Sequence, residues 1–127
     1  MHELGITEGI IQRAREAAEE AGGTRVTDVY LTITPAADFT VDSIEMYFEM
    51  LTDGDDYFSG ARLHWEVQTA AASCLQCGAT FQASEPRPDC PHCRGRQVRF
   101  DPRAPMLQIV GVDVAEEGDT DPDEASR

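Results

Sequence analysis

Two cysteine pairs constrain this chain more than any other feature. The pairs are Cys74-Leu75-Gln76-Cys77 and Cys90-Pro91-His92-Cys93, with twelve residues between them. Two residues between cysteines let one tight turn direct both sulfur atoms to a common point, and two facing turns place four thiolates at the corners of a tetrahedron. The spacing therefore predicts a zinc site whose ligands are Cys74, Cys77, Cys90 and Cys93.

The glycines after the pairs and the number of ligands refine this prediction. Gly78 and Gly95 follow the two pairs, and we expect both to supply the positive φ that such turns often need. Four protein ligands leave no open position on the metal, so the ion is expected to be structural and not catalytic.

Other roles for the cysteines fit the sequence less well. Disulfides would suit a secreted chain, but Met1–Gly5 carries a carboxylate and no basic segment typical of a signal peptide. A thioredoxin-type redox pair needs one C-x-x-C at the start of a helix, not two facing pairs. Iron, as in rubredoxin, uses the same four sulfurs and stays open.

Length and cysteine usage set the general class of protein. At 127 residues the chain is expected to form one small domain, or one domain with an inserted lobe. No apolar run reaches the roughly 18 residues of a membrane span. Reduced, metal-bound cysteines favour a cytoplasmic protein.

The charge balance disfavours a role in nucleic-acid binding. The net charge is −14, from 24 acidic and 10 basic residues, whereas nucleic-acid binders usually show a basic patch. The nearest basic cluster lies on or beside the cysteine lobe and consists of Arg87, Arg94, Arg96, Arg99 and Arg103. Residues 115–127 hold six acids and one base and are expected to be a disordered acidic tail.

Hydrophobic periodicity predicts two helices and three strands outside the cysteine lobe. Helical spacing of apolar residues and turn signals indicate one helix over 4–21 and another that begins at Thr40 or Asp42. Alternation and β-branched residues indicate strands. The expected strands are 26–33, 61–67 and 106–114, and the cysteine lobe at about 72–100 lies between the last two.

This element order predicts an α+β fold: two helices on a three-stranded, mostly antiparallel sheet, with an inserted four-cysteine zinc ribbon. We expect three parts, namely 1–71 plus 104–114 as an α+β domain, 72–103 as a zinc-binding lobe, and 115–127 as the tail. The first part also carries a second candidate metal site, at its N-terminus.

Met1-His2-Glu3 forms a second candidate metal site. An α-amine titrates near 8 and is a good ligand once deprotonated. The Met1 amine, the His2 backbone nitrogen and the His2 imidazole can close chelate rings on one ion, and such planar nitrogens suit Ni(II) or Cu(II). Glu3 could add an oxygen. Position alone does not separate this site from an exposed histidine that binds nothing.

The two candidate sites together resemble the HypA/HybF family of hydrogenase maturation nickel metallochaperones. The resemblance covers nearly all of residues 1–114. It is carried by Met1-His2-Glu3-Leu4 and its helix, Ser73–Phe81, Cys90-Pro91-His92-Cys93, Phe48-Glu49, Gly60-Ala61-x-Leu63 and Leu107-Gln108-Ile109.

This resemblance implies a discrete function. Such proteins take Ni(II) at the N-terminus, here Met1, His2 and Glu3, and pass it toward the active site of [NiFe]-hydrogenase. They work with a HypB-type maturation GTPase and the hydrogenase large subunit, and some members also serve urease. Zn(II) would be structural at the four cysteines. An acid of the 35–42 loop, Asp38 or Asp42, could complete the nickel shell.

The remaining candidates have simpler interpretations. His92 and His64 are expected to be surface residues, Trp65 a core residue, and Met46, Met50 and Met106 packing residues. No phosphate-binding loop and no acid–base pair for a histidine is evident, so no enzyme activity is expected. The alternatives to the carrier are a zinc-ribbon interaction or nucleic-acid adaptor with an inert N-terminus, and a rubredoxin-like electron carrier.

Overall fold

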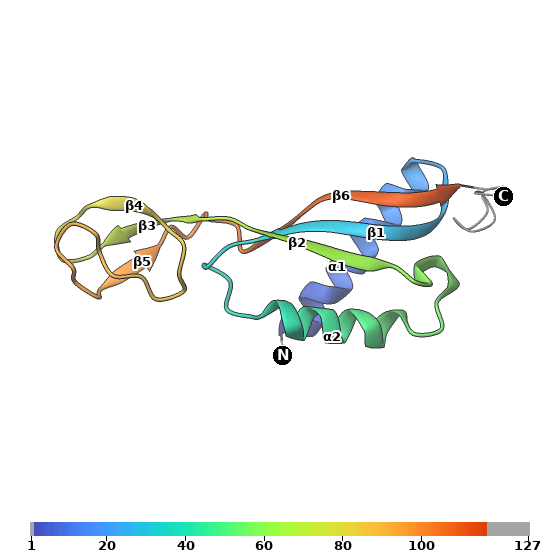
Figure 1. Cartoon of the computed structure of the whole chain (residues 1–127), viewed down its shortest axis with the longest axis horizontal. Coiled ribbons are helices and arrows are strands. Elements are labelled where there is room, and N and C mark those ends of the chain that lie inside the picture. The colour runs from blue at the N-terminus through green and yellow to red at the C-terminus, as the bar shows by residue number, and fades with distance from the viewer. Residues whose placement is uncertain (1, 117–127) are drawn as a thin grey trace, which may run out of the picture. The chain divides into compact units, whose positions relative to one another are not determined.

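The computed structural model describes residues 2–116 and contains two helices and two three-stranded sheets (Figure 1). No helix among these residues is long and apolar enough to cross a membrane. In chain order the elements are α1 (His2–Glu20), β1 (Gly23–Ile33), α2 (Val41–Thr52), the 3-10 turn η1 (Asp56–Phe58), β2 (Arg62–Val67), β3 (Ala70–Cys74), β4 (Thr80–Ala83), β5 (Val98–Phe100) and β6 (Leu107–Glu116).

The first sheet has the strand order β2-β1-β6. Contacts between β1 and β2 advance together along both strands: Asp28 bonds His64, and the Ile33 carbonyl accepts from the Gln68 N–H. The two strands are therefore parallel. Parallel neighbours need a long crossover connection, which α2 supplies.

Strands β1 and β6 run in opposite directions. Thr24 bonds the Ala115 carbonyl, while Tyr30, further along β1, bonds Asp113, which comes earlier in β6. In the second sheet, β3 pairs antiparallel with both β4 and β5. The expected fold class is confirmed. In the first sheet, which is the sheet that the sequence predicts, the β1–β6 pair is antiparallel and the β1–β2 pair is parallel.

The chain divides into two compact units. One holds the residues up to 30, residues 41–64 and the residues from 109 onward; the other holds residues 31–40 and 65–108. The second unit contains the cysteine lobe, whose internal sheet of β3, β4 and β5 was not predicted. The functional boundaries at 72 and 103 stay a prediction.

The core of the first unit is formed by α1, α2 and β1. Helix α1 buries four residues at helical spacing, Thr7, Ile10, Ala14 and Ala18. Thr7 is tolerated there because its hydroxyl donates to the Glu3 carbonyl at 2.7 Å. The predicted buried face of the first strand is confirmed: Val29 is buried in the first unit, and Leu31 and Ile33, which belong to the second unit, are buried as well.

The expectations about methionine packing and about the tail need correction. Met46 and Met50 are 53% and 57% exposed and Met106 is 43% exposed, so they are not core residues. Residues 46 and 50 lie on a face of α2 that the core does not cover, because Ile44 and Phe48 supply its buried side. Strand β6 also extends through Glu116, two residues into the predicted tail; residues 117–127 lie outside the described residues.

Gly23 gives a testable case of close packing. A Cβ at this position would lie 2.6 Å from Cβ of Val114 and 2.9 Å from its Cγ2. Gly23→Ala is therefore expected to destabilise the protein by about 1–3 kcal/mol, the usual cost of overpacking. Gly9→Ala is the matched control, because a Cβ there meets nothing within 4 Å. In mid-helix it should stabilise by about 0.5–1 kcal/mol. Urea unfolding measures both, and equal effects would contradict the packing argument.

Candidate metal centres

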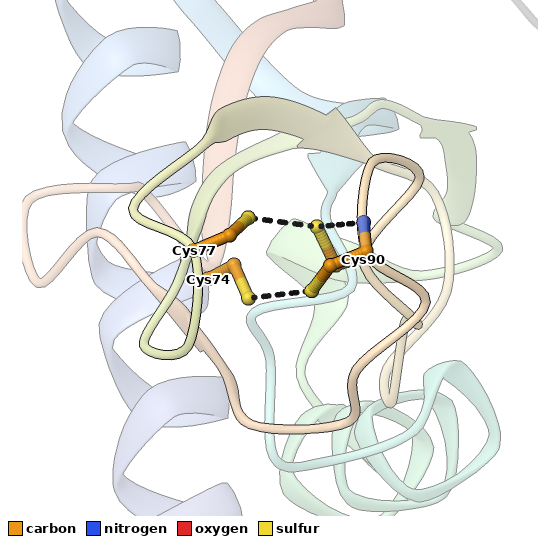
Figure 2. A group of neighbouring side chains, drawn as sticks. Cys74, Cys77 and Cys90 are labelled. Atoms are coloured by element: carbon orange, nitrogen blue, oxygen red, sulfur yellow. Dashed lines mark hydrogen bonds between the residues drawn. The ribbon is translucent and has the colours of Figure 1, made fainter.

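The four cysteines converge on one point, as the spacing predicts. Their sulfur atoms all lie within 4.8 Å of one another. Two cross-pair distances are 3.6 Å, from Cys74 to Cys93 and from Cys77 to Cys90 (Figure 2). A tetrahedral ion with metal–sulfur bonds of about 2.3 Å would separate its sulfurs by roughly 3.8 Å. The cluster therefore fits one four-coordinate metal ion.

The first cysteine pair is held by a turn at the end of β3. The Gly78 N–H donates to the Cys74 carbonyl at 3.0 Å, and the Cys74 N–H donates to the Ala79 carbonyl at 2.9 Å. The Gln76 N–H donates to the Cys74 sulfur at 3.3 Å. Gly78 has a φ of 78°, as predicted.

The second pair repeats this turn with one change. The Arg94 backbone N–H donates to the Cys90 carbonyl at 2.8 Å, and the Cys90 backbone N–H donates to the Gly95 carbonyl at 2.9 Å. The His92 N–H donates to the Cys90 sulfur at 3.4 Å. The residue with positive φ is Arg94, at 62°, and not Gly95. The prediction for Gly95 was therefore wrong, and the position after the second cysteine of each pair carries the left-handed conformation.

Gly95 instead lies close to the end of the Gln76 side chain. A Cβ there would lie 1.6 Å from Oε1 of Gln76 and 3.2 Å from the Cys93 sulfur. The two turns approach each other at this point, so a side chain on residue 95 would displace Gln76 and press on a ligand atom.

Backbone N–H groups favour the thiolate form of the first cysteine in each pair. The Cys93 N–H, 3.5 Å from the Cys90 sulfur, is the main reason that the pKa of Cys90 falls to about 6. The pKa of Cys74 is also lowered, chiefly by the Cys77 N–H. Thiolates are the form that binds metal.

The second cysteine of each pair has a raised pKa. The Gly95 N–H favours the Cys93 thiolate, but the Cys74 thiol and desolvation outweigh it and raise the pKa of Cys93 to about 11. For Cys77 the Ala79 N–H acts against desolvation and the Cys90 thiol, and the pKa is raised. Four thiolates so close together would repel one another. A cation between the four sulfurs would offset that repulsion.

The structure favours a metal site over the other roles of the cysteines. All four are free thiols. The first pair lies in a turn after a strand and does not open a helix, unlike a thioredoxin motif. Four protein ligands form a closed site, which is typical of structural metals.

The second candidate site begins at the first turn of α1. Met1 lies outside the described residues. His2 is the first residue of α1 and Glu3 the second; their side chains are 53% and 24% exposed, with His2 Nδ1 3.9 Å from Glu3 Oε1. The sequence placed the helix start at residue 4, so the structure brings His2 and Glu3 into the helix itself.

The helix start makes these groups suitable ligands. The first four N–H groups of a helix have no intrahelical acceptor, so the His2 nitrogen can turn to an ion without breaking a helical bond. A hydrogen bond from its own backbone N–H holds the pKa of Glu3 below its usual range. Asp42 lies exposed in the first turn of α2 in the first unit, whereas Asp38 belongs to the second unit.

The other two histidines lie at the surface, as expected, although His64 is more engaged than the sequence indicated. Its Nε2 lies 2.7 Å from Asp28, and its ring stacks on Tyr30 at 4.8 Å. Tyr30 donates to Asp113 at 2.6 Å, and this bond raises the pKa of Tyr30 to about 12. His92 is exposed.

Comparison with known proteins decides the family. The family model described as "Hydrogenase/urease nickel incorporation, metallochaperone, hypA" matches residues 1–108. The chain belongs to the HypA family. Hydrogenase maturation factor HypA of Caldanaerobacter subterraneus is 32% identical over 114 residues, which cover 90% of this chain and 99% of that protein. HybF of Salmonella typhimurium is 29% identical over 114 residues, with the same coverage.

A solved structure supports the same assignment at the level of the fold. The solution structure of the nickel metallochaperone HypA from Helicobacter pylori has a TM-score of 0.63 with this chain at 15% identity. The match covers 91% of this chain and 99% of that one. This HypA-family member is thus a hydrogenase maturation factor of the nickel metallochaperone class, with a four-cysteine metal site.

Proposed function

We propose that this HypA-family protein binds Ni(II) at Met1, His2 and Glu3 and delivers it for the maturation of [NiFe]-hydrogenase. The observation that carries the proposal is the family match over residues 1–108 in a chain whose His2 opens helix α1. The amine, the His2 nitrogen and the imidazole supply chelating nitrogens of the kind that Ni(II) prefers.

A carrier must release its ion, and the position of His2 favours release. A helix macrodipole places roughly half a positive charge at the N-terminus. It opposes a bound cation by about 0.3–1 kcal/mol at an exposed site. Protons also compete for the amine and the imidazole, so binding weakens as the pH falls. Glu3 is the nearby negative charge, and Asp38 or Asp42 would be a further oxygen ligand.

Zn(II) is proposed for Cys74, Cys77, Cys90 and Cys93, where the four sulfurs fit a tetrahedral ion. Its contribution is to fold the lobe and hold its turns together. With no open coordination position, the ion is not assigned any chemistry on a substrate, and the protein is proposed to act as a carrier without catalysis of its own.

The proposed partners follow from the family role. They are a HypB-type maturation GTPase, which shares the handling of nickel, and the hydrogenase large subunit, which receives it. The description of the family model also names urease, so urease maturation is a further proposed role. The place of action is the cytoplasm, where thiols stay reduced and can hold zinc.

The function can be tested in a bacterial strain that lacks its own HypA-family gene. We expect this chain to restore hydrogenase activity at low nickel, and His2→Ala to fail, because the imidazole is a nickel ligand. His64→Ala should restore activity, since His64 bonds Asp28 far along the sequence from the proposed ligands. Equal restoration by His2→Ala would instead favour an adaptor with an inert N-terminus.

A further inference from the structure

The cysteine lobe carries a groove that the nickel and zinc sites do not use. It has a volume of about 480 Å³ and lies over the sheet of β4, β3 and β5. We call it the ribbon groove, and the side chains that matter here are Ala71, Ser73, Thr80, Gln82, Arg99 and Asp101. Its volume falls in the roughly 300–1,000 Å³ range of ligand sites.

The groove exists because the central strand has small side chains on one face. Ala70, Ala72 and Cys74 of β3 are buried, and the alternate residues Ala71 and Ser73 face the other way. The neighbouring strands place longer side chains beside them, with Gln82 opposite Ala71 and Arg99 opposite Ser73. The longer side chains of β4 and β5 therefore form the two sides of the groove, and the small side chains of β3 form its base.

One row across the sheet combines a cation with two hydroxyl groups. Ser73 is the direct partner of Thr80 on β4 and of Arg99 on β5. Directly opposed residues share a face, with Cβ atoms about 4.5–5.5 Å apart. The Arg99 guanidinium and the two hydroxyls can therefore meet one ligand group.

The donors of this row are available to a ligand. Within residues 2–116, Arg99 makes no ion pair, and the Ser73 and Thr80 hydroxyls make no hydrogen bond. Asp101, the carboxylate in the same groove, is engaged elsewhere. It accepts the Arg103 N–H at 2.9 Å and its side-chain Nε at 3.4 Å, and the N–H is the main reason that the pKa of Asp101 is lowered.

The charge of the lobe differs in sign from that of the whole chain. Residues 72–103 contain five arginines and three acids, a net charge of +2, while the whole chain carries −14. The lobe thus presents local positive charge to an anionic group, but the chain as a whole repels a long polyanion such as nucleic acid.

We propose that the ribbon groove binds an acidic, extended peptide segment of a partner protein. Arg99 pairs with a side-chain carboxylate of that segment, and Ser73 and Thr80 donate to its second oxygen. Guanidinium–carboxylate hydrogen bonds of this kind are among the strongest in proteins. This site is separate from the proposed nickel ligands and does not depend on nickel.

The test uses the full-length, zinc-loaded protein and a fluorescein-labelled hexapeptide in which Ser and Glu alternate. Fluorescence anisotropy at about 0.15 M salt, where surface charges are screened beyond roughly 8 Å, measures its affinity. We expect Arg99→Gln to weaken binding roughly 10- to 100-fold, as the loss of a charge-assisted hydrogen bond does. Thr80→Val should weaken it by a smaller factor.

The matched control is Arg87→Gln. It makes the same charge change in the same lobe, but Arg87 lines a different cavity, so binding should change less than about 2-fold. Zinc content must equal that of the parent in every variant. Equal losses for Arg99→Gln and Arg87→Gln would overturn the proposal in favour of diffuse attraction. So would equal binding of a peptide with Gln in place of Glu, or Arg99-dependent displacement of the peptide by a single-stranded oligonucleotide.

Discussion

Replacing Cys90 with serine is expected to remove the proposed zinc ion and unfold the cysteine lobe. Cys90 is 1% exposed, and its sulfur accepts N–H groups from His92 and Cys93, so it organises its turn as well as binding the metal. Structural zinc contributes about 10–16 kcal/mol of apparent binding free energy, which is also folding free energy. We therefore expect metal analysis to fall from one zinc per chain to well below one.

The rest of the chain provides an internal control for this experiment. Helices α1 and α2 belong to the first compact unit, so the helical circular dichroism of Cys90→Ser should stay near that of the parent. His92→Ala is the matched variant in the same turn. It keeps the backbone N–H that bonds Cys90, and its zinc content should stay at one. Full zinc content in Cys90→Ser would contradict the four-thiolate site.

The second large effect is expected from His2→Ala, which should lower nickel affinity by at least about 100-fold. Loss of a residue in the outer shell of a metal site already costs about 10–100-fold, and His2 is proposed to supply a direct ligand. Isothermal titration calorimetry with Ni(II) measures the change. Zinc content should be unaffected, because the four cysteines lie in the other compact unit.

Two aspartate variants would then locate the remaining ligand. Asp38→Asn and Asp42→Asn each remove one carboxylate from the 35–42 loop and the start of α2. If one of them completes the nickel shell, its replacement should weaken nickel binding by a smaller factor than His2→Ala, while the other variant stays at the parent value. A His2→Ala protein with parent affinity would rule out the proposed site.

The cysteine site shows how far spacing alone can predict geometry. The two C-x-x-C pairs predict convergence of four sulfurs, because a two-residue separation constrains each turn locally. The spacing did not reveal that Arg94 takes the left-handed conformation, since glycine is the usual residue there. The signal was present in the repeat itself: Arg94 holds the same place in its turn as Gly78.

The direction of the β1–β2 pair and the start of α1 were harder to predict. Hydrophobic alternation fixes which face of a strand is buried but says nothing of the direction of its neighbour. The βαβ order from β1 through α2 carried that information. The helix start at His2 was missed because Met1 is the only apolar residue before Leu4, and a single residue is too little to extend the helical pattern.

The first proposed nickel ligand is the terminal amine of Met1. The most direct test is Ni(II) titration of tag-free protein with a native Met1, beside the same protein with one extra N-terminal residue. The extension moves the amine and leaves His2, Glu3 and the four cysteines in place. We expect the extended protein to lose nickel binding and to keep one zinc per chain. Equal nickel affinity in both proteins would contradict it and would place the ion elsewhere in the chain.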